Sequence, residues 1–234
     1  MRRYFDATDL LCVDLKKYTI FKDLSEAEAR DVEDRITLTR LKKGSVVYRE
    51  GCNIGGIYIV ISGILKIYKT GVEGKDQIIR FAKVGDPIGY RSVVAGETAC
   101  TSAEALTESS VCYVPADIIQ NLFKKNSKFA QTLLSIVCKE LGDANKFILN
   151  LAQKTVRERL AQVLLTLLET FEMDEEKRLR IAMTREDLAN MVGTATESVI
   201  RLLSEFKADK LIELQGRYIK LVDIPQLMKV AGIR

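Results

Sequence analysis

The apolar positions in the first half of the chain follow a two-residue period that glycines interrupt. Between residues 20 and 114, short runs rich in Val, Ile and Tyr alternate with turns, as in Ile57-Tyr-Ile-Val-Ile-Ser-Gly63-Ile-Leu-Lys-Ile-Tyr. This pattern predicts an antiparallel β-roll or barrel. Strands are expected within residues 41–51, 57–62, 64–68, 78–84, 87–90, 103–106 and 110–114. A short helix is expected before them at residues 25–32, with Ser25 as its cap.

The period becomes helical near residue 117. Residues 117–152 contain no proline, and one apolar seam advances in alternating steps of three and four: Leu134, Val137, Leu141, Ala144, Ile148 and Leu151. This is the a/d spacing of a left-handed coiled coil, and it predicts a long helix that pairs in parallel with a second copy. The alternative is an amphipathic helix that packs only on its own domain. A second stripe, Leu133, Ile136 and Phe147, could serve that packing and leave the seam exposed.

The last third of the chain is predicted to be mostly helical. A helix over residues 156–172 and a charged break at 173–178 precede two short helices within residues 183–206. Thr184-Arg-Glu-Asp187 is typical of a helix start, and Gly193 is expected to end the first short helix in a tight turn. Thr194 or Thr196 is the expected cap of the second short helix.

Two strands around Gln215-Gly216 are expected to form a hairpin, and Asp223 is expected to cap a terminal helix that has Pro225 in its first turn. Two short helices joined by a glycine turn and followed by a hairpin describe a winged helix-turn-helix. The sequence therefore predicts an α+β chain in three parts. These are a β-roll over residues 1–116, a dimerisation helix over 117–153 and a DNA-binding domain over 154–234.

The polar residues at the start of the second short helix indicate DNA recognition. Thr196, Glu197, Ile200 and Arg201 lie opposite the apolar stripe of that helix. Arg can pair with guanine O6 and N7, Glu can accept from the cytosine amine, and Ile can contact a thymine methyl group. Alternatively, Glu197 completes a capping box with Thr194, and Arg201 pairs with Glu197 or Glu205. The candidate DNA-binding residues are Thr184, Arg185, Thr194, Thr196, Glu197, Ser198, Ile200 and Arg201.

Composition excludes several other functions. The chain has no histidine, and its five cysteines are widely spaced without a CxxC motif, which argues against an enzyme, a cysteine-rich zinc site, a disulfide framework and histidine-ligated haem. No apolar run is long enough for a membrane span, and the first residues do not resemble a signal peptide, so a cytoplasmic location is expected. From residue 153 onward, 14 Lys or Arg face 13 Asp or Glu, a difference of +1. DNA binding must therefore depend on the local placement of charge.

The order of these elements resembles the cyclic-AMP receptor protein/FNR (Crp/Fnr) family of bacterial transcription regulators. The residues that carry the resemblance are Gly44, Gly51, Ile61-Ser-Gly63, Gly85-Asp-Pro-Ile-Gly89, Arg159-Leu-Ala-Gln-Val-Leu-Leu and residues 184–203. The resemblance implies a cyclic-nucleotide-binding-like jelly roll, a homodimer, double-stranded DNA as ligand and RNA polymerase as a partner. It also implies a recognition motif E-x-x-x-R at Glu197 and Arg201. A palindromic operator with a G·C pair in each half-site follows, while Thr196 and Ile200 depart from the family and leave the outer bases open.

The resemblance also indicates where an effector would bind in the roll. Cyclic-nucleotide binders of the family use a Glu for the ribose and an Arg for the phosphate, but this chain has Tyr90 and Cys100 at those positions. Cyclic AMP is therefore not expected to bind in the usual manner. The effector-pocket candidates are Gly89, Tyr90, Arg91, Cys100, Thr101, Ser102 and Asn145. Arg91 could enter the pocket or face solvent.

The cysteines bear on two further sensing mechanisms. An iron–sulfur cluster of the FNR kind needs several cysteines near the N-terminus, and Cys12 is alone among the first 50 residues. Thiol-based sensing by Cys100 is a hypothesis that oxidation would test. An unknown small molecule, or no effector at all, remains. The rival to a DNA-binding regulator is a ligand- or partner-binding module whose helix-turn-helix is only a packing unit.

Overall fold

The computed structural model describes residues 14–176 and 178–233. It contains mixed helices and antiparallel sheets, which confirms the α+β prediction. The described residues form two compact units: residues up to 69 with 79–141, and residues 70–78 with 142–233. Cys12 lies outside the described residues. No helix in the described part of the chain has the length and apolar character to cross a membrane.

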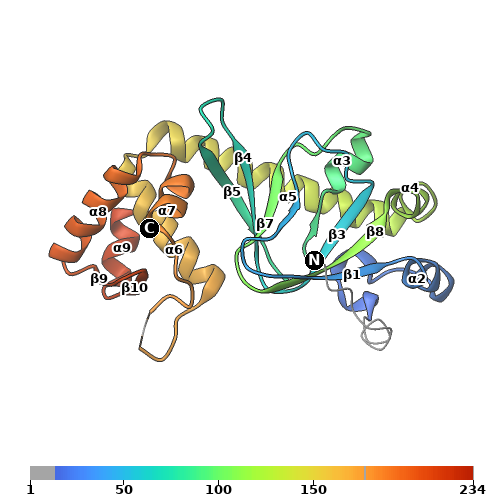
Figure 1. Ribbon diagram of the computed structural model, residues 1–234, viewed down its shortest axis with the longest axis horizontal. Coiled ribbons are helices and arrows are strands. Elements are labelled where there is room, and N and C mark those ends of the chain that lie inside the picture. Colours follow the sequence, from blue (N-terminus) through green and yellow to red (C-terminus); the bar gives the residue numbers. More distant parts are fainter. Residues whose placement is uncertain (1–13, 177, 234) are drawn as a thin grey trace. The chain divides into compact units, whose positions relative to one another are not determined.

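The first unit contains the β-roll (Figure 1). Its helical elements are the 3-10 turns η1 (Leu15–Lys17) and η2 (Thr19–Phe21), and the helices α2 (Glu26–Glu33), α3 (Tyr90–Ala95), α4 (Ala116–Lys125) and the first part of α5 (Ser127–Gln153). The strands are β1 (Thr37–Leu41), β2 (Val46–Tyr48), β3 (Gly56–Ser62), β4 (Leu65–Thr70), β5 (Asp76–Ala82), β6 (Pro87–Ile88), β7 (Ser102–Ala105) and β8 (Ser109–Pro115). Ser25 caps α2 in a full capping box with Glu28, as predicted.

The strands form two four-stranded sheets, ordered β1-β8-β3-β6 and β2-β7-β4-β5. β8 pairs antiparallel with both β1 and β3. Successive residues of β3 enter different cores: Ile59 packs with the helices, while Val60 packs with the second sheet. In β8, likewise, Cys112 packs with the helices and Val111 packs with the second sheet. Because side chains alternate across a strand, β3 and β8 are buried on both faces.

Glycine allows a close approach between β3 and the loop before β8. Gly63 has φ +77°, and a Cβ added there would lie 2.3 Å from Ser109 Oγ and 2.4 Å from the Glu108 carbonyl oxygen. No other residue type fits this conformation and this space. The turn predicted at Gly63 is therefore also a position where two backbone segments pack closely.

The structure corrects three expectations in this unit. Residues 117–152 form two helices, because Asn126 is extended (φ −109°, ψ 100°) and its side-chain oxygen caps the second helix by accepting from Phe129 N at 2.9 Å. The expected strand at 87–90 ends at Ile88, and Gly89 with φ +79° begins the helix α3. Strand β1 was not predicted at all.

The second unit contains the winged helix-turn-helix. It comprises the end of α5, then α6 (Val156–Phe171), α7 (Arg185–Val192), α8 (Thr196–Ala208), the hairpin strands β9 (Ile212–Gln215) and β10 (Tyr218–Leu221), and α9 (Ile224–Val230). β9 and β10 pair antiparallel around Gly216. Asp223 caps α9 by accepting from Gln226 N at 2.9 Å. The predicted elements of this region are confirmed.

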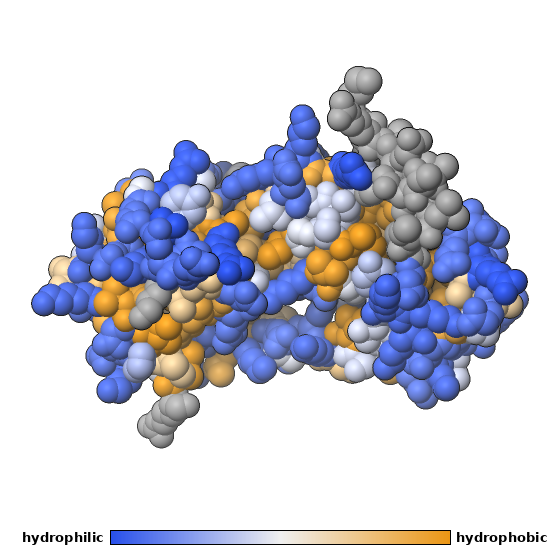
Figure 2. Space-filling model, turned by 90° about the horizontal axis from the view of Figure 1, so that it is seen from below, coloured by the Kyte–Doolittle hydropathy of each residue, from blue (hydrophilic) through white to orange (hydrophobic). Residues whose placement is uncertain are grey.

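The coiled-coil seam of α5 is exposed. Leu134, Leu141 and Ile148 are 60%, 61% and 62% exposed, whereas Leu133 of the second stripe is buried and Ile136 packs against the core. Six of the fifteen large apolar side chains that are exposed in the described residues lie on α5. On the face that Figure 2 shows, apolar residues appear as separate patches among hydrophilic ones. Exposed apolar residues gathered on one helix are typical of a protein–protein contact.

Candidate nucleic-acid interface

The first helix of the motif, α7, begins and ends as its sequence predicts. Thr184 Oγ1 accepts from Asp187 N at 2.9 Å and donates to the Asp187 carboxylate at 2.7 Å. Gly193 ends the helix with φ +72°, and its N–H donates to the Ala189 carbonyl at 2.9 Å. Leu188 and Ala189 are fully buried. These local bonds define the turn between the two helices of the motif.

Arg159 of α6 anchors that turn. Its Nε donates to the Val192 carbonyl at 2.9 Å, and its Nη1 donates to the Lys154 carbonyl at 2.9 Å. The last carbonyl groups of a helix have no intrahelical partner, and a cation there is favourable. Arg159 thus joins the end of α7 to α6 and gives α8 a defined starting position.

The second helix, α8, separates its buried and exposed faces cleanly. Its buried residues are Val199, Leu202, Leu203 and Phe206. Glu197, Ile200 and Arg201 are exposed, and Thr196 and Ser198 are half-buried. The cap prediction is wrong, because Ala195 occupies the N-cap and no side chain caps the helix there. The first N–H groups of α8 therefore have no side-chain acceptor, a state that favours an anion.

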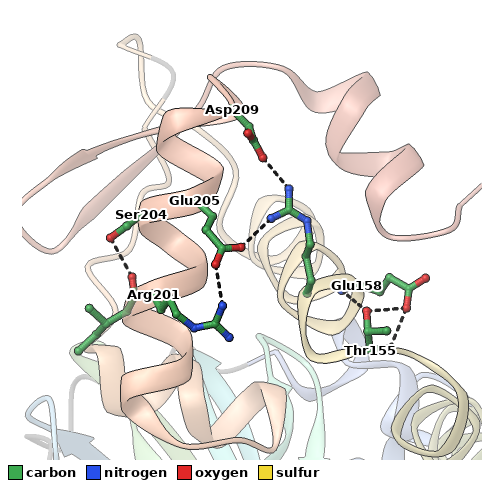
Figure 3. Close-up of polar contacts among 8 residues, drawn as sticks. Thr155, Glu158, Arg201, Ser204, Glu205 and Asp209 are labelled. Atoms are coloured by element: carbon green, nitrogen blue, oxygen red, sulfur yellow. Dashed lines mark hydrogen bonds and ion pairs between the residues drawn. The ribbon is translucent and has the colours of Figure 1, made fainter.

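Arg201 is held within its own helix. Its Nη1 donates to Glu205 Oε1 at 2.7 Å, one of the two pairings that the sequence allowed. The same carboxylate accepts from Arg157 Nη1 on α6 at 3.1 Å, and Arg157 Nη2 also donates to Asp209 at 2.6 Å. Figure 3 shows Arg201, Glu205 and Asp209 along one side of α8. Sequence reasoning missed the contribution of Arg157.

Arg185 lies against the hairpin, or wing. Its Nη2 donates to the Gly216 carbonyl at 3.1 Å. Its Nη1 is buried and has no hydrogen-bond partner among the described residues, and burial lowers the pKa of this arginine. The side chain therefore links the start of α7 to the wing turn. Thr194, the remaining candidate, is half-buried in the turn before α8.

A cluster of polar side chains surrounds Tyr90, one of the effector-pocket candidates of the roll. Tyr90 is buried and donates a hydrogen bond to Glu140 of α5, and burial followed by this bond raises the pKa of Tyr90. Glu140 Oε1 lies 2.8 Å from Arg80 Nη2. The structure thus places a cation and a carboxylate beside Tyr90, both from positions that sequence reasoning did not single out. An internal ion pair satisfies these charges without a ligand.

The other pocket candidates are divided between the interior and the surface. Ser102 is buried and accepts from Glu50 N at 3.0 Å, while Thr101 shares a hydrogen bond with Tyr48, whose pKa burial raises to about 12. Cys100 is half-buried. Arg91 faces solvent and lies 3.6 Å from Glu97. Asn145 is exposed on the part of α5 that belongs to the second unit.

A β-roll followed along the chain by a long helix and a winged helix-turn-helix defines the class of a DNA-binding regulator. Residues 38–126 match the cyclic nucleotide-binding domain family, and residues 158–230 match the Crp-like helix-turn-helix domain family. The chain is 30% identical over 213 residues to the fumarate and nitrate reduction regulatory protein of Vibrio cholerae, covering 90% of this chain and 85% of that protein.

Two other proteins are similar over most of their length. The transcriptional activator protein anr of Pseudomonas aeruginosa is 31% identical over 194 residues, covering 82% of this chain and 79% of that protein. The structure of FixK2 from Bradyrhizobium japonicum has a TM-score of 0.73 and 26% identity, covering 83% of this chain and 96% of that one. The chain belongs to the Crp/Fnr family of transcription regulators. It is a DNA-binding regulator and not an enzyme.

Proposed function

We propose that the protein binds a two-fold symmetric operator as a homodimer and reads a G·C pair in each half-site with Glu197 and Arg201. The observation that carries the proposal is that α8 has one exposed and one buried face. Glu197 and Arg201 lie on the exposed face, opposite a fully buried apolar stripe. The uncapped start of α8 supports it, because its N–H groups suit a DNA phosphate. A regulator that binds DNA in this way would act in the cytoplasm, with RNA polymerase as a further partner.

The exposed seam of α5 supports the homodimer. A parallel pair of these helices would bury Leu134, Leu141 and Ile148 against their counterparts. Two recognition helices of a dimer bind successive major grooves when they lie about one duplex turn apart, ~34 Å. The seam therefore supplies the symmetry that a palindromic operator requires.

The roll supports modulation by an effector less directly. Tyr90 and Cys100 replace the two residues that would bind a cyclic nucleotide, and the Arg80–Glu140 pair satisfies the charges beside them. We propose that an effector, where one acts, is not cyclic AMP bound in the usual manner. An effector that binds beside Tyr90 would have to compete with Glu140 for the tyrosine hydroxyl.

Selection from random duplex DNA by the purified full-length protein tests the operator proposal. We expect a two-fold symmetric motif with G·C pairs at fixed spacing. Binding titrations on that motif should show Arg201→Ala at least about 30-fold weaker, since the homodimer loses one bidentate arginine–guanine pair of about 1–3 kcal/mol in each of its two half-sites. Lys207→Ala removes the same charge from an exposed site farther along α8 and is the matched control. Equal affinities for wild type and Arg201→Ala would contradict the proposal.

A further inference from the structure

The recognition arginine is coupled to a second arginine through one carboxylate. Glu205 accepts from Arg201 with Oε1 at 2.7 Å and from Arg157 with Oε2 at 3.1 Å. The two arginines come from different helices, Arg201 from α8 and Arg157 from α6. Figure 3 shows Arg201 and Glu205 side by side on α8. An exposed pair four residues apart on a helix contributes little to stability by itself. What distinguishes this pair is that Glu205 also bonds to Arg157 of another helix, α6.

Arg157 is the fixed end of this bridge. Its Nη2 donates to Asp209 at 2.6 Å, and its guanidinium carbon lies 4.7 Å from the centre of the Phe206 ring. Phe206 is fully buried, and the Arg157 side chain is only 35% exposed. The Arg201 side chain, by contrast, is 69% exposed. Contacts with the core thus restrain Arg157, Arg157 restrains Glu205, and Glu205 in turn restrains the exposed Arg201.

Arg201 can bind a base while it remains bonded to Glu205. A guanidinium has five N–H donors, and Glu205 takes one at Nη1. The Nε and Nη2 donors can still form the parallel pair that guanine O6 and N7 require. An arginine already held by a carboxylate loses less rotamer freedom when it binds. A carboxylate close to DNA also repels the phosphates and so weakens binding to every sequence.

We propose that Glu205, anchored by Arg157, is a positioning residue that orients Arg201 for guanine and thereby increases specificity at the expense of nonspecific affinity. This inference rests on the proposed reading of a G·C pair by Arg201. It assigns opposite effects to one side chain. Removing its charge should strengthen binding to unrelated DNA and weaken the preference for guanine. A residue that only supported the fold would weaken both.

Parallel selections with wild type, Glu205→Gln and Glu213→Gln test the proposal, followed by titrations on the enriched duplex and on a copy with the G·C pairs replaced by A·T. We expect Glu205→Gln to reduce the affinity ratio of the two duplexes about fivefold, part of what one bidentate pair supplies. Its affinity for the A·T copy should rise about twofold. Glu213 pairs with Lys220 at 3.3 Å on the wing, so Glu213→Gln removes the same charge without touching Arg201. It should keep the wild-type ratio.

Arg157→Lys provides a second variant, because lysine lacks the planar fork that bridges Glu205 and Asp209. It should lower the ratio in the same direction without the rise in nonspecific affinity. Thermal unfolding establishes that each variant is folded. If wild type selects no guanine, the proposed function fails. If wild type selects guanine and folded Glu205→Gln and Arg157→Lys keep its ratio, only the positioning role is wrong.

Discussion

The helix-turn-helix and the roll retain different amounts of the chemistry that the family resemblance implies. In α8 the Glu197 and Arg201 positions are kept, and both side chains are exposed. In the roll, Tyr90 and Cys100 stand where the resemblance implies the two charged ligand-binding residues, and the buried Tyr90 donates a hydrogen bond to Glu140. The proposed DNA-reading surface thus leaves its polar side chains open to an external partner, whereas the polar groups around Tyr90 in the roll bond to one another.

The largest expected effect comes from the helix that a dimer would share. Leu141→Glu places a charge on a side chain that is 61% exposed here and would be buried in a coiled coil. We expect a monomer in sedimentation experiments and more than about 100-fold weaker operator binding, because the second half-site is no longer held at high effective concentration. Lys139→Glu, on the outer side of the heptad, should leave the dimer intact. A dimeric Leu141→Glu would show that the seam is not the interface.

Removal of the Tyr90 hydroxyl tests whether the Tyr90–Glu140 hydrogen bond only stabilises the roll or also controls DNA binding. Tyr90→Phe deletes the hydrogen bond to Glu140 and keeps the ring. We expect the free energy of unfolding to fall by about 1–2 kcal/mol, as for a bond to a partly exposed charged group, with unchanged operator affinity. Urea unfolding and a binding titration measure the two quantities. A tenfold change in operator affinity without a change in stability would instead connect the cluster to DNA binding.

A helix cap in the second unit provides a smaller effect. Thr155 caps α6 in a capping box with Glu158, so Thr155→Ala should lower the free energy of unfolding by about 0.5–2 kcal/mol. The Thr155 hydroxyl and N–H hold the pKa of Glu158 below its usual value. That contribution is present above the unfolded pKa of a glutamate and is lost as pH falls through the lower folded pKa. The difference between the two proteins should therefore narrow in acid. A constant difference across that range would show that Glu158 is not linked to the cap.

The smallest effect concerns the thiols. Burial raises the pKa of Cys112 to about 12, whereas Cys52 and Cys138 are exposed. Alkylation followed by peptide mass spectrometry should modify the exposed thiols in the native protein and Cys112 only after unfolding. The half-buried Cys100 carries the redox hypothesis. If oxidation alters operator affinity in wild type but not in Cys100→Ser, the hypothesis is supported. If both proteins respond alike, it is wrong.

The elements that local chemistry determines were predictable from the sequence. Ser25, Thr184, Gly193 and Asp223 each mark a helix end through a bond to a neighbour a few residues away. The break at Asn126 was not predictable from the period, because apolar residues continue at helical spacing on both sides. Its signal was an asparagine, which is a good N-cap.

The candidate sites show the same division. The exposure of Glu197 and Arg201 follows from the period of a single helix, so the sequence was sufficient. The Arg80–Glu140 pair and the Arg157–Glu205 bridge join residues far apart in the chain. Pattern reasoning along one segment cannot reveal such pairs, because neither partner is unusual where it stands.

The double burial of β3 and β8 has a consequence for how the roll acquires its pairing. A strand with one solvent-exposed face resists a one-residue shift in pairing register, since the shift would expose its apolar side chains to water. A slip of β3 would exchange one apolar core for the other and would meet little such resistance. The bulge between Val60 and Ser62 and the contact of Gly63 with Ser109 are then the features that define the alignment. Substitution of Gly63 should therefore produce misaligned, aggregation-prone chains rather than a native roll of lower stability.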